Sequence, residues 1–427
     1  MNRLGLGKKA MIAVMGITLL GSPSLGSSVS ATAIKPELSM ILDDVPLTLG
    51  VKPMLKNNVT LVPFRALANT LGIAVTWEAK TKTIYAQGLV DGVIRNVVLR
   101  VGQKTASVDG KTVDLTAAPM VVNNQTLIPL SFFGTQFGAK VSWSKDTNII
   151  TIVSPKKAMH LRAFYALGSF GQRARISSMD SVAFGWTRIN EKGELTLEGA
   201  DYYWPEAAGE VTPEALVQDS SAQGAKPYLM VYSVDGKGEL TKMLSDETLR
   251  NTSIDHIVRL AEDTRFDGVL LDFEGLGLWL DPLGQQKLLN DYVQVLDAKL
   301  EAKGVKLSLA VPPPNSNYKG YDYKTLATYA DDLVIMAYDY NPKGTPDHTP
   351  EPNTKVEEAI QMMVTAGIPA EKIILGISLW NETTETVDDK LGLAKRYGLK
   401  GASFWRLTFY GNDFANAIDR VVEKVGE

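Results

Sequence analysis

The chain has 427 residues but no cysteine, and it has only three histidines, His160, His256 and His348. The missing cysteines exclude disulfides, thiolate metal sites and cysteine nucleophiles. The histidine spacing fits neither a metal site nor a Ser-His-Asp triad, so we expect no metal and no cofactor. The net charge is −4, which gives no reason to expect nucleic acid or an anionic membrane as a partner.

Long apolar runs are absent except near the start of the chain. Residues 1–33 contain a short apolar stretch, from Ala10 to Gly21, preceded by the basic residues Arg3, Lys8 and Lys9. This pattern is typical of a secretory signal peptide, cleaved after Ala31 or Ala33; the alternative is an uncleaved membrane anchor. We therefore predict a protein secreted to the bacterial cell surface or cell wall, with no membrane segment after cleavage.

The length favours two domains, and the first of them contains an internal repeat. Within residues 34–155 six residues recur 66 positions later: Asn58, Leu61, Pro63, Gly72, Val75 and Trp77 as Asn124, Leu127, Pro129, Gly138, Val141 and Trp143. Each copy predicts a strand, a short helix with proline in its first turn and glycine after its end, and a strand pair. Residues 34–155 are therefore expected to form a small duplicated β-rich α+β domain.

This segment resembles the domain named after the N-terminus of copper amine oxidases, which is common on bacterial surface proteins. A copper site is not expected, because residues 34–155 contain neither histidine nor cysteine. Trp77 and Trp143 suggest a sugar-stacking pair, but their equivalent repeat positions favour core packing. For this domain we expect a stalk or a module that attaches the protein to the cell wall.

From residue 160 to residue 427 apolar strand-like runs alternate with helical stretches. The eight predicted strands are Leu161 to Leu167, Ser181 to Thr187, Lys226 to Ser233, Phe266 to Glu274, Val305 to Val311, Asp332 to Tyr340, Lys372 to Leu379 and Gly401 to Leu407. Eight alternations in 268 residues predict an α/β fold, a (β/α)8 TIM barrel. The active site of such a barrel lies at the carboxyl ends of its strands.

The fourth predicted strand carries two carboxylates inside an apolar run. Asp272 and Glu274 stand two residues apart, so they point to the same face of the strand as Leu270. Burying two acids is costly, and like charges this close raise the pKa of at least one of them. A carboxylic acid that stays protonated near neutral pH is what glycoside hydrolysis requires.

Three motifs, and a fourth stretch that points to one branch, resemble family-18 glycoside hydrolases. Asp267 to Glu274 is similar to the fourth-strand signature Asp-x-x-Asp-x-Asp-x-Glu, and Met336 to Tyr340 is similar to the sixth-strand Met-x-Tyr-Asp. Ser403 to Trp405 resembles the eighth-strand end of the family, and Tyr321 to Lys324 resembles its branch of spore-cortex and peptidoglycan N-acetylglucosaminidases. The resemblance spans nearly all of residues 160–427.

The resemblance implies substrate-assisted, retaining hydrolysis of β-1,4 linkages next to N-acetylglucosamine, in peptidoglycan, spore cortex or chitin. Glu274 would be the general acid and then the base, Asp272 would hold the acetamido N–H, and Tyr338 would donate to the acetamido oxygen. Asp339 would support the sugar hydroxyls or the Glu274 network, and Trp405 would stack under the sugar ring.

Some assignments stay open. Four aromatic residues near other strand ends are candidates for lining the substrate groove or for packing: Tyr165, Trp186, Tyr232 and Trp380. Leu270 replaces the central aspartate of the signature, which predicts an altered pH optimum and leaves open an inert sugar-binding protein on the same barrel. Only about 20 residues separate Trp380 from Gly401, too few for the α+β insertion of many chitinases, so we expect a shallow, open cleft. A purely structural surface protein would not explain the buried acids.

Overall fold

The structure is a computed structural model, and it describes residues 38–426 apart from residues 91, 167 and 198–209. The predicted signal peptide lies outside the described residues. Among the residues that are described, no helix is long and apolar enough to cross a membrane.

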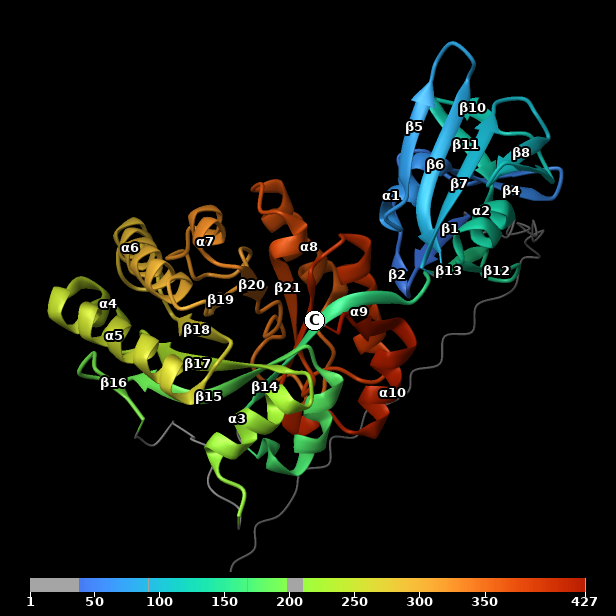
Figure 1. The fold of residues 1–427 in the computed structure, drawn as a ribbon. Helices are drawn as coiled ribbons and strands as arrows, with labels where there is room; N and C mark the ends of the chain where they lie inside the picture. The colour runs from blue at the N-terminus through green and yellow to red at the C-terminus, as the bar shows by residue number, and fades with distance from the viewer. Residues whose placement is uncertain (1–37, 91, 167, 198–209, 427) are drawn as a thin grey trace, which may run out of the picture. The chain divides into compact units, whose positions relative to one another are not determined.

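The segment before the barrel consists of three small sheets and two short helices (Figure 1). The strand orders are β12-β13-β1-β2, β10-β11-β4-β3 and β5-β6-β7-β8-β9. The elements are β1 (Ser39–Leu42), β2 (Val45–Pro46), β3 (Met54–Lys56), β4 (Val59–Pro63), α1 (Phe64–Thr70), β5 (Ala74–Glu78), β6 (Thr83–Val90), β7 (Val93–Arg100), β8 (Thr105–Val108), β9 (Lys111–Asp114), β10 (Met120–Val122), β11 (Gln125–Pro129), α2 (Leu130–Phe137), β12 (Lys140–Ser144) and β13 (Ile149–Val153).

The predicted duplication is confirmed by the order of these elements. The run β3-β4-α1-β5-β6 is followed by the equivalent run β10-β11-α2-β12-β13, and β4 pairs with β11 across the two copies. Both helices contribute to one core, in which the rings of Phe64 and Phe133 meet edge to face with centroids 5.8 Å apart. Pro63 and Pro129 end the strands β4 and β11 and precede the helices, one position earlier than predicted.

The two equivalent tryptophans are not core residues, so the prediction that they pack inside is wrong. Trp77 in β5 is 38% exposed and Trp143 in β12 is 45% exposed. Both strands lie at the edge of their sheets. Repeat symmetry gives equivalent residues equivalent surroundings, but it does not say whether those surroundings are inside or outside.

The second part of the chain is a closed barrel of eight parallel strands, as predicted. Its strands are β14 (Lys157–Tyr165), β15 (Ser181–Ile189), β17 (Lys226–Val234), β18 (Gly268–Glu274), β19 (Lys306–Val311), β20 (Asp332–Ile335), β21 (Ile373–Ser378) and β22 (Gly401–Trp405). Pairing of β14 with both β15 and β22 closes the barrel. Short strands β16 (Leu195–Thr196) and β23 (Val422–Lys424) extend β15 and β14.

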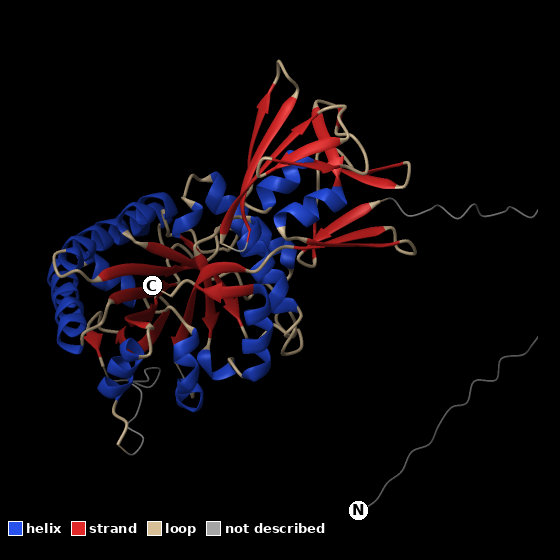
Figure 2. Cartoon of the chain, turned by 45° about the vertical axis from the view of Figure 1, so that its right-hand side comes forward, coloured by secondary structure: helices blue, strands red, loops and turns tan. Residues whose placement is uncertain are grey.

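Helices surround the strands, which Figure 2 shows in red inside the blue helices. The helices are α3 (Pro213–Ala222), α4 (Glu239–Ser245), α5 (Glu247–Thr264), α6 (Pro282–Glu301), α7 (Tyr323–Tyr329), α8 (Asn353–Thr365), α9 (Thr386–Arg396) and α10 (Asn412–Val421), with 3-10 turns η1 (Ser169–Ser178), η2 (Ala370–Lys372) and η3 (Leu407–Phe409). Most of the apolar core lies between the strands and these helices, and a smaller apolar cluster fills the barrel interior.

Strand β20 ends at Ile335, five residues before the predicted end. The N–H groups of Ala337 and Tyr338 each donate to a carbonyl only two residues back, at 2.9 Å, and this turns the backbone out of the ladder. Asp339 then adopts a left-handed conformation with φ of 62°. Tyr338 and Asp339 therefore lie on the loop that follows the sixth strand of the barrel.

The amino-terminal end of the barrel interior holds a buried ionic network. Arg162 and Asp332 are both fully buried and form an ion pair with Nη1 to Oδ1 at 2.9 Å. Lys400 Nζ lies 2.8 Å from the other oxygen of Asp332, and Ser308 donates to the same carboxylate. Burial alone would raise the pKa of Asp332, but Arg162 and Lys400 together lower it.

Candidate active site

Two acidic side chains of β18 lie at the opposite, carboxyl end of the barrel. Leu270 belongs to the apolar cluster inside the barrel, so alternation along β18 directs Asp272 and Glu274 to the interior as well. Asp272 is 4% exposed, whereas Glu274, at the end of the strand, is partly exposed. One buried carboxyl and one partly exposed carboxyl therefore lie at the carboxyl end of the barrel, the end at which the sequence analysis expects the active site.

No cation neutralises this pair in the part of the chain that the structure describes. Burial, and then the charge of Glu274, raises the pKa of Asp272 well above its ordinary value. Asp272 Oδ1 is buried and has no hydrogen-bond partner among the described residues. Burial, and then the charge of Asp339, raises the pKa of Glu274 to about 7. Glu274 is therefore a carboxylic acid poised to exchange a proton near neutral pH.

Tyr338 completes an electrostatic cluster with these acids. Burial, followed by the charges of Asp272, Glu274 and Asp339, raises the pKa of the Tyr338 phenol. A Cβ atom at Gly376 would lie 3.2 Å from the Tyr338 ring, so glycine at this position of β21 makes room for it. The phenol thus keeps its proton and remains a hydrogen-bond donor beside two carboxyl groups.

Buried groups that the sequence did not indicate fix the loop of Asp339. Glu351 accepts the N–H groups of Asp339 and Tyr340, each at 3.0 Å. The Asn381 amide donates to Glu351 at 2.8 Å, and Glu382 accepts the Glu351 N–H at 3.1 Å. Glu351 is 3% exposed, so this network holds the backbone of the loop rather than contacting solvent.

A cleft of about 370 Å³ opens beside this cluster. Its lining residues come from the loop after β20 and from the ends of β21 and β22: Tyr338, Asp339, Ser378, Trp380, Asn381, Trp405, Arg406 and Phe409. The partly exposed Trp405 ring packs edge-on against Phe164, with centroids 5.3 Å apart, and Trp380 is 39% exposed. The cleft thus brings together four of the predicted site residues, and it adds Arg406 and Asn381, which the sequence analysis missed.

The remaining aromatic candidates fall in different places. Tyr232 is partly buried in the barrel interior and stands opposite Asp272 in the register of β17 and β18. Tyr165 is 4% exposed and packs outside the strands, 5.2 Å from the Phe184 ring, so its assignment to the groove is wrong. Alternation explains this, because the neighbouring Phe164 is the residue that points inward. The Trp186 side chain lies outside the described residues.

Within the described ranges, no group of three or more His, Cys, Asp or Glu side chains is arranged to hold a metal ion.

A (β/α)8 barrel with acids and exposed indoles at the carboxyl ends of its strands has the form of a carbohydrate-active enzyme. The family model described as Glycosyl hydrolases family 18 matches residues 163–398, and the chain belongs to this family. The family model described as Copper amine oxidase N-terminal domain matches residues 41–152. Both resemblances expected from the sequence are confirmed.

Two curated relatives illustrate the similarity. A putative sporulation-specific glycosylase, YdhD, of Bacillus subtilis is 25% identical over 181 residues, which are 40% of this chain and 42% of that protein. A cortical fragment-lytic enzyme of Bacillus anthracis is 26% identical over 181 residues, 40% of this chain and 41% of that protein. The chain therefore spans less than half the length of either relative.

Solved structures agree on the fold. A chitinase from Chromobacterium violaceum has a TM-score of 0.52 at 22% identity, covering 62% of this chain and 98% of that one. The spore cortex-lytic enzyme SleL of Bacillus megaterium has a TM-score of 0.52 at 14% identity, covering 64% and 76%. At these identities the likeness establishes the barrel architecture.

Proposed function

We propose that this chain is a secreted glycosidase that cleaves β-1,4 linkages next to N-acetylglucosamine, with peptidoglycan or spore cortex preferred over chitin. One observation carries the proposal: Asp272 is buried without a cation, beside a Glu274 carboxyl whose pKa is raised to about 7. In a family-18 barrel this pair has a chemical use, because it can protonate a leaving group and hold an N-acetyl group.

In the first step the protonated Glu274 gives its proton to the glycosidic oxygen as the bond from C1 to that oxygen breaks. The carbonyl oxygen of the substrate's 2-acetamido group attacks C1 and forms an oxazolinium ion. Asp272 Oδ1 lacks a partner, and it would accept the acetamido N–H. The Tyr338 hydroxyl would donate to the acetamido oxygen and orient it towards C1.

In the second step the Glu274 carboxylate takes a proton from a water molecule. The oxygen of that water attacks C1 from the face that the leaving group vacated. The bond from C1 to the acetamido oxygen breaks, the acetamide is restored, and the configuration at C1 is retained. Glu274 returns to its protonated form. The same residue serves as acid and then as base, which a pKa of about 7 favours.

Arg406 supports a preference for an anionic glycan. Its side chain is partly buried in the cleft directly after Trp405, and its guanidinium carbon lies 5.2 Å from the centroid of the Phe409 ring. Arg406 Nε is buried and has no hydrogen-bond partner among the described residues. Peptidoglycan carries lactyl and peptide carboxylates that a guanidinium binds well, whereas chitin carries none. Two relatives named for cortex or sporulation point the same way.

The test is digestion of purified peptidoglycan and of chitin oligomers by the wild type and by Glu274→Gln, with products identified by mass and by anomer. We expect new N-acetylglucosamine reducing ends, first formed as the β-anomer, and none from the variant. De-N-acetylated glycan should resist cleavage, because its free amine cannot attack C1 as an acetamide does. Binding of both polymers without cleavage by the wild type would instead indicate an inert sugar-binding protein.

Arg406→Gln tests the polymer preference separately. We expect it to lower kcat/KM on peptidoglycan fragments by about tenfold, the size of a lost charge-assisted hydrogen bond, and to leave chitin oligomers nearly unaffected. Equal losses on both polymers would contradict recognition of an anionic group.

Secretion itself is tested by sequencing the N-terminus of the exported protein, which we expect to begin after Ala31 or Ala33.

A further inference from the structure

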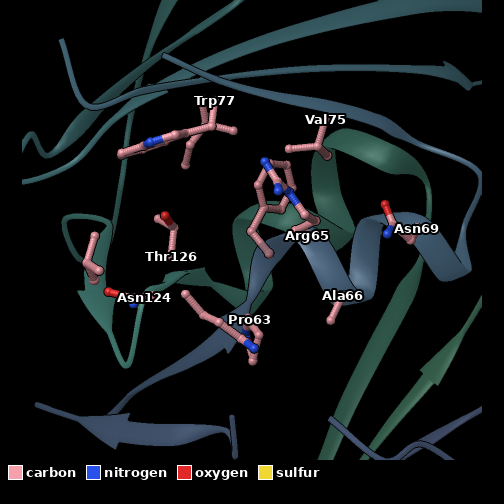
Figure 3. Close-up of a pocket in the computed structure, with 12 residues that line it drawn as sticks. Pro63, Arg65, Ala66, Asn69, Val75, Trp77, Asn124 and Thr126 are labelled. Carbon is pink, nitrogen blue, oxygen red and sulfur yellow. The ribbon is translucent and has the colours of Figure 1, made fainter. Parts of the chain in front are cut away.

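We propose that the domain before the barrel carries a second carbohydrate site, a pocket that binds the anionic glycan strand of peptidoglycan. The pocket has a volume of about 660 Å³, within the range of about 300–1,000 Å³ typical of small-molecule sites. The residues that we assign to binding are Arg65, Asn69, Trp77, Asn124, Gln125 and Thr126 (Figure 3). The choice of ligand rests on the proposed function, because the barrel would act on the same polymer.

The pocket lies where the two repeat copies meet. One side is formed by α1, β5 and β6 of the first copy, and the other by the hairpin of β10 and β11 in the second copy. Figure 3 shows Trp77 at the upper left, Asn124 below it with Thr126 between them, and Arg65 near the centre of the view, extending from α1. Side chains from α1, β5 and the β10–β11 hairpin thus converge on one concave space.

Trp77 supplies a stacking surface. Trp77 is 38% exposed, and Val121, which also lines the pocket, is 46% exposed. The exposed part of this large flat ring makes no packing contact, but it matches the C–H face of a pyranose ring. Its indole N–H remains available as a donor to a sugar hydroxyl.

The polar lining matches the rest of such a ligand. The amides of Asn69, Asn124 and Gln125 each offer a donor and an acceptor, which suits sugar hydroxyl and N-acetyl groups. Arg65 is exposed, and within the described parts of the chain no carboxylate forms an ion pair with it. A free guanidinium at a sugar-sized pocket favours a carboxylate of peptidoglycan over a neutral glycan.

Comparison of the two repeat copies separates binding from packing. Sixty-six positions away, Trp77 corresponds to the exposed Trp143, but Arg65 corresponds to Ser131 and Asn69 to Thr135. Gln125 corresponds to Val59 in the first copy. A packing requirement of the repeat would act on both copies alike. The cation and the extra amides occur at one tryptophan only, which a ligand at that pocket explains.

The experiment compares Trp77→Ala with its matched control Trp143→Ala, both in the full chain carrying Glu274→Gln so that the polymer is not cleaved. The barrel cleft is then identical in every sample, and differences report the pocket. Affinity for insoluble peptidoglycan is measured by sedimentation. We expect Trp77→Ala to weaken binding by about tenfold and Trp143→Ala by less than about twofold. Equal affinities of the two variants would overturn the proposal.

Arg65→Gln tests the charge. We expect it to weaken peptidoglycan binding by about threefold, with less effect as salt rises, and to leave chitin binding unchanged. Equal weakening on both polymers, or none, would overturn recognition of a carboxylate. Hydrolysis of a short soluble oligosaccharide by the wild type measures the activity of the barrel site alone. If the wild type does not hydrolyse the oligosaccharide, the proposed function of the barrel is contradicted. The pocket proposal is then decided by the sedimentation measurements alone.

Discussion

The two ends of the barrel interior bury carboxyl groups in opposite ways. At the amino end Asp332 is fully buried but lies between Arg162 and Lys400, and its pKa is lowered. At the carboxyl end Asp272 is also buried, the like charge of Glu274 adds to the effect of burial, and its pKa is raised. The same strands therefore support one neutralised site and one that is not neutralised.

This difference separates a carboxylate that the fold stabilises from carboxyl groups that the fold leaves uncompensated. A buried carboxylate costs several kcal/mol unless a cation and hydrogen bonds compensate it. The amino end meets this requirement with Arg162, Lys400 and Ser308, so Asp332 is accounted for by folding alone. The carboxyl end leaves the requirement unmet, and the proposed role of Glu274 as a proton donor to the substrate would account for this.

The largest expected effect follows from breaking the neutralised end. Arg162→Met leaves Asp332 buried with only Lys400 as a cation, so we expect the free energy of unfolding to fall by about 3–5 kcal/mol. Chemical denaturation with circular dichroism measures this loss. The double variant Arg162→Met with Asp332→Leu should recover much of it, and a single variant as stable as the wild type would contradict the pairing.

At the other end, removing the charge should stabilise the protein. The pKa of Glu274 is about 7 in the fold against 4.5 when unperturbed, so the wild type loses stability as pH rises from about 4.5 to 7. Glu274→Gln mimics the protonated acid, and at pH 8 we expect it to be more stable by about 3 kcal/mol. Near pH 4 the two proteins should unfold alike. Thermal melts across this range check both statements, and a constant difference at every pH would contradict them.

The charge of Asp339 should contribute to the raised pKa of Glu274. In the proposed mechanism activity requires protonated Glu274, so we expect the alkaline limb of kcat/KM to fall near its pKa of about 7. After burial, Asp339 is the next cause of the raised pKa, so Asp339→Asn should move this limb to lower pH, by less than about one unit. A pH–rate profile on a soluble oligosaccharide shows the shift, and movement to higher pH would be the wrong sign.

The smallest effect concerns the support of that loop. Glu351→Gln keeps one oxygen for the two N–H groups of Asp339 and Tyr340, and loses the other acceptor. We expect kcat to fall by about threefold to tenfold with little change of fold, as for the loss of one hydrogen bond. Glu357→Gln in α8 changes a carboxylate that pairs with Arg396 and does not line the cleft, so it serves as the control for loss of a carboxylate charge elsewhere in the barrel domain.

Much of this arrangement could be predicted from local pattern. Alternation within one strand placed Asp272, Glu274 and Leu270 on a common face, and the eight βα units predicted the closed barrel. The pairing of Arg162 with Asp332 could not be read from the sequence, because 170 positions separate them and only barrel closure brings them together. Tyr165 was assigned to the groove because its strand was known but its face was not.

The remaining gaps have similar causes. The early end of β20 depends on backbone turns after Ile335, which an apolar run does not reveal. Arg406 and Asn381 line the cleft and directly follow Trp405 and Trp380 in the sequence. They could have been predicted as cleft residues from their position next to tryptophans at strand ends. The exposure of Trp77 and Trp143 is set by edge strands, and repeat symmetry carries no information on that.

The most direct test of the difference between the two ends is a carbon-13 NMR titration of the glutamate side-chain carboxyls, with the signal of Glu274 identified by its loss in Glu274→Gln. Because burial and the charge of Asp339 raise the pKa of Glu274, we expect a titration midpoint near 7 for this carboxyl, together with loss of hydrolysis over the same pH range. A midpoint at or below the ordinary value of 4.5 would mean that the carboxyl is stabilised as an anion. Glu274 could then not be the acid, and the two ends of the barrel would not differ as described.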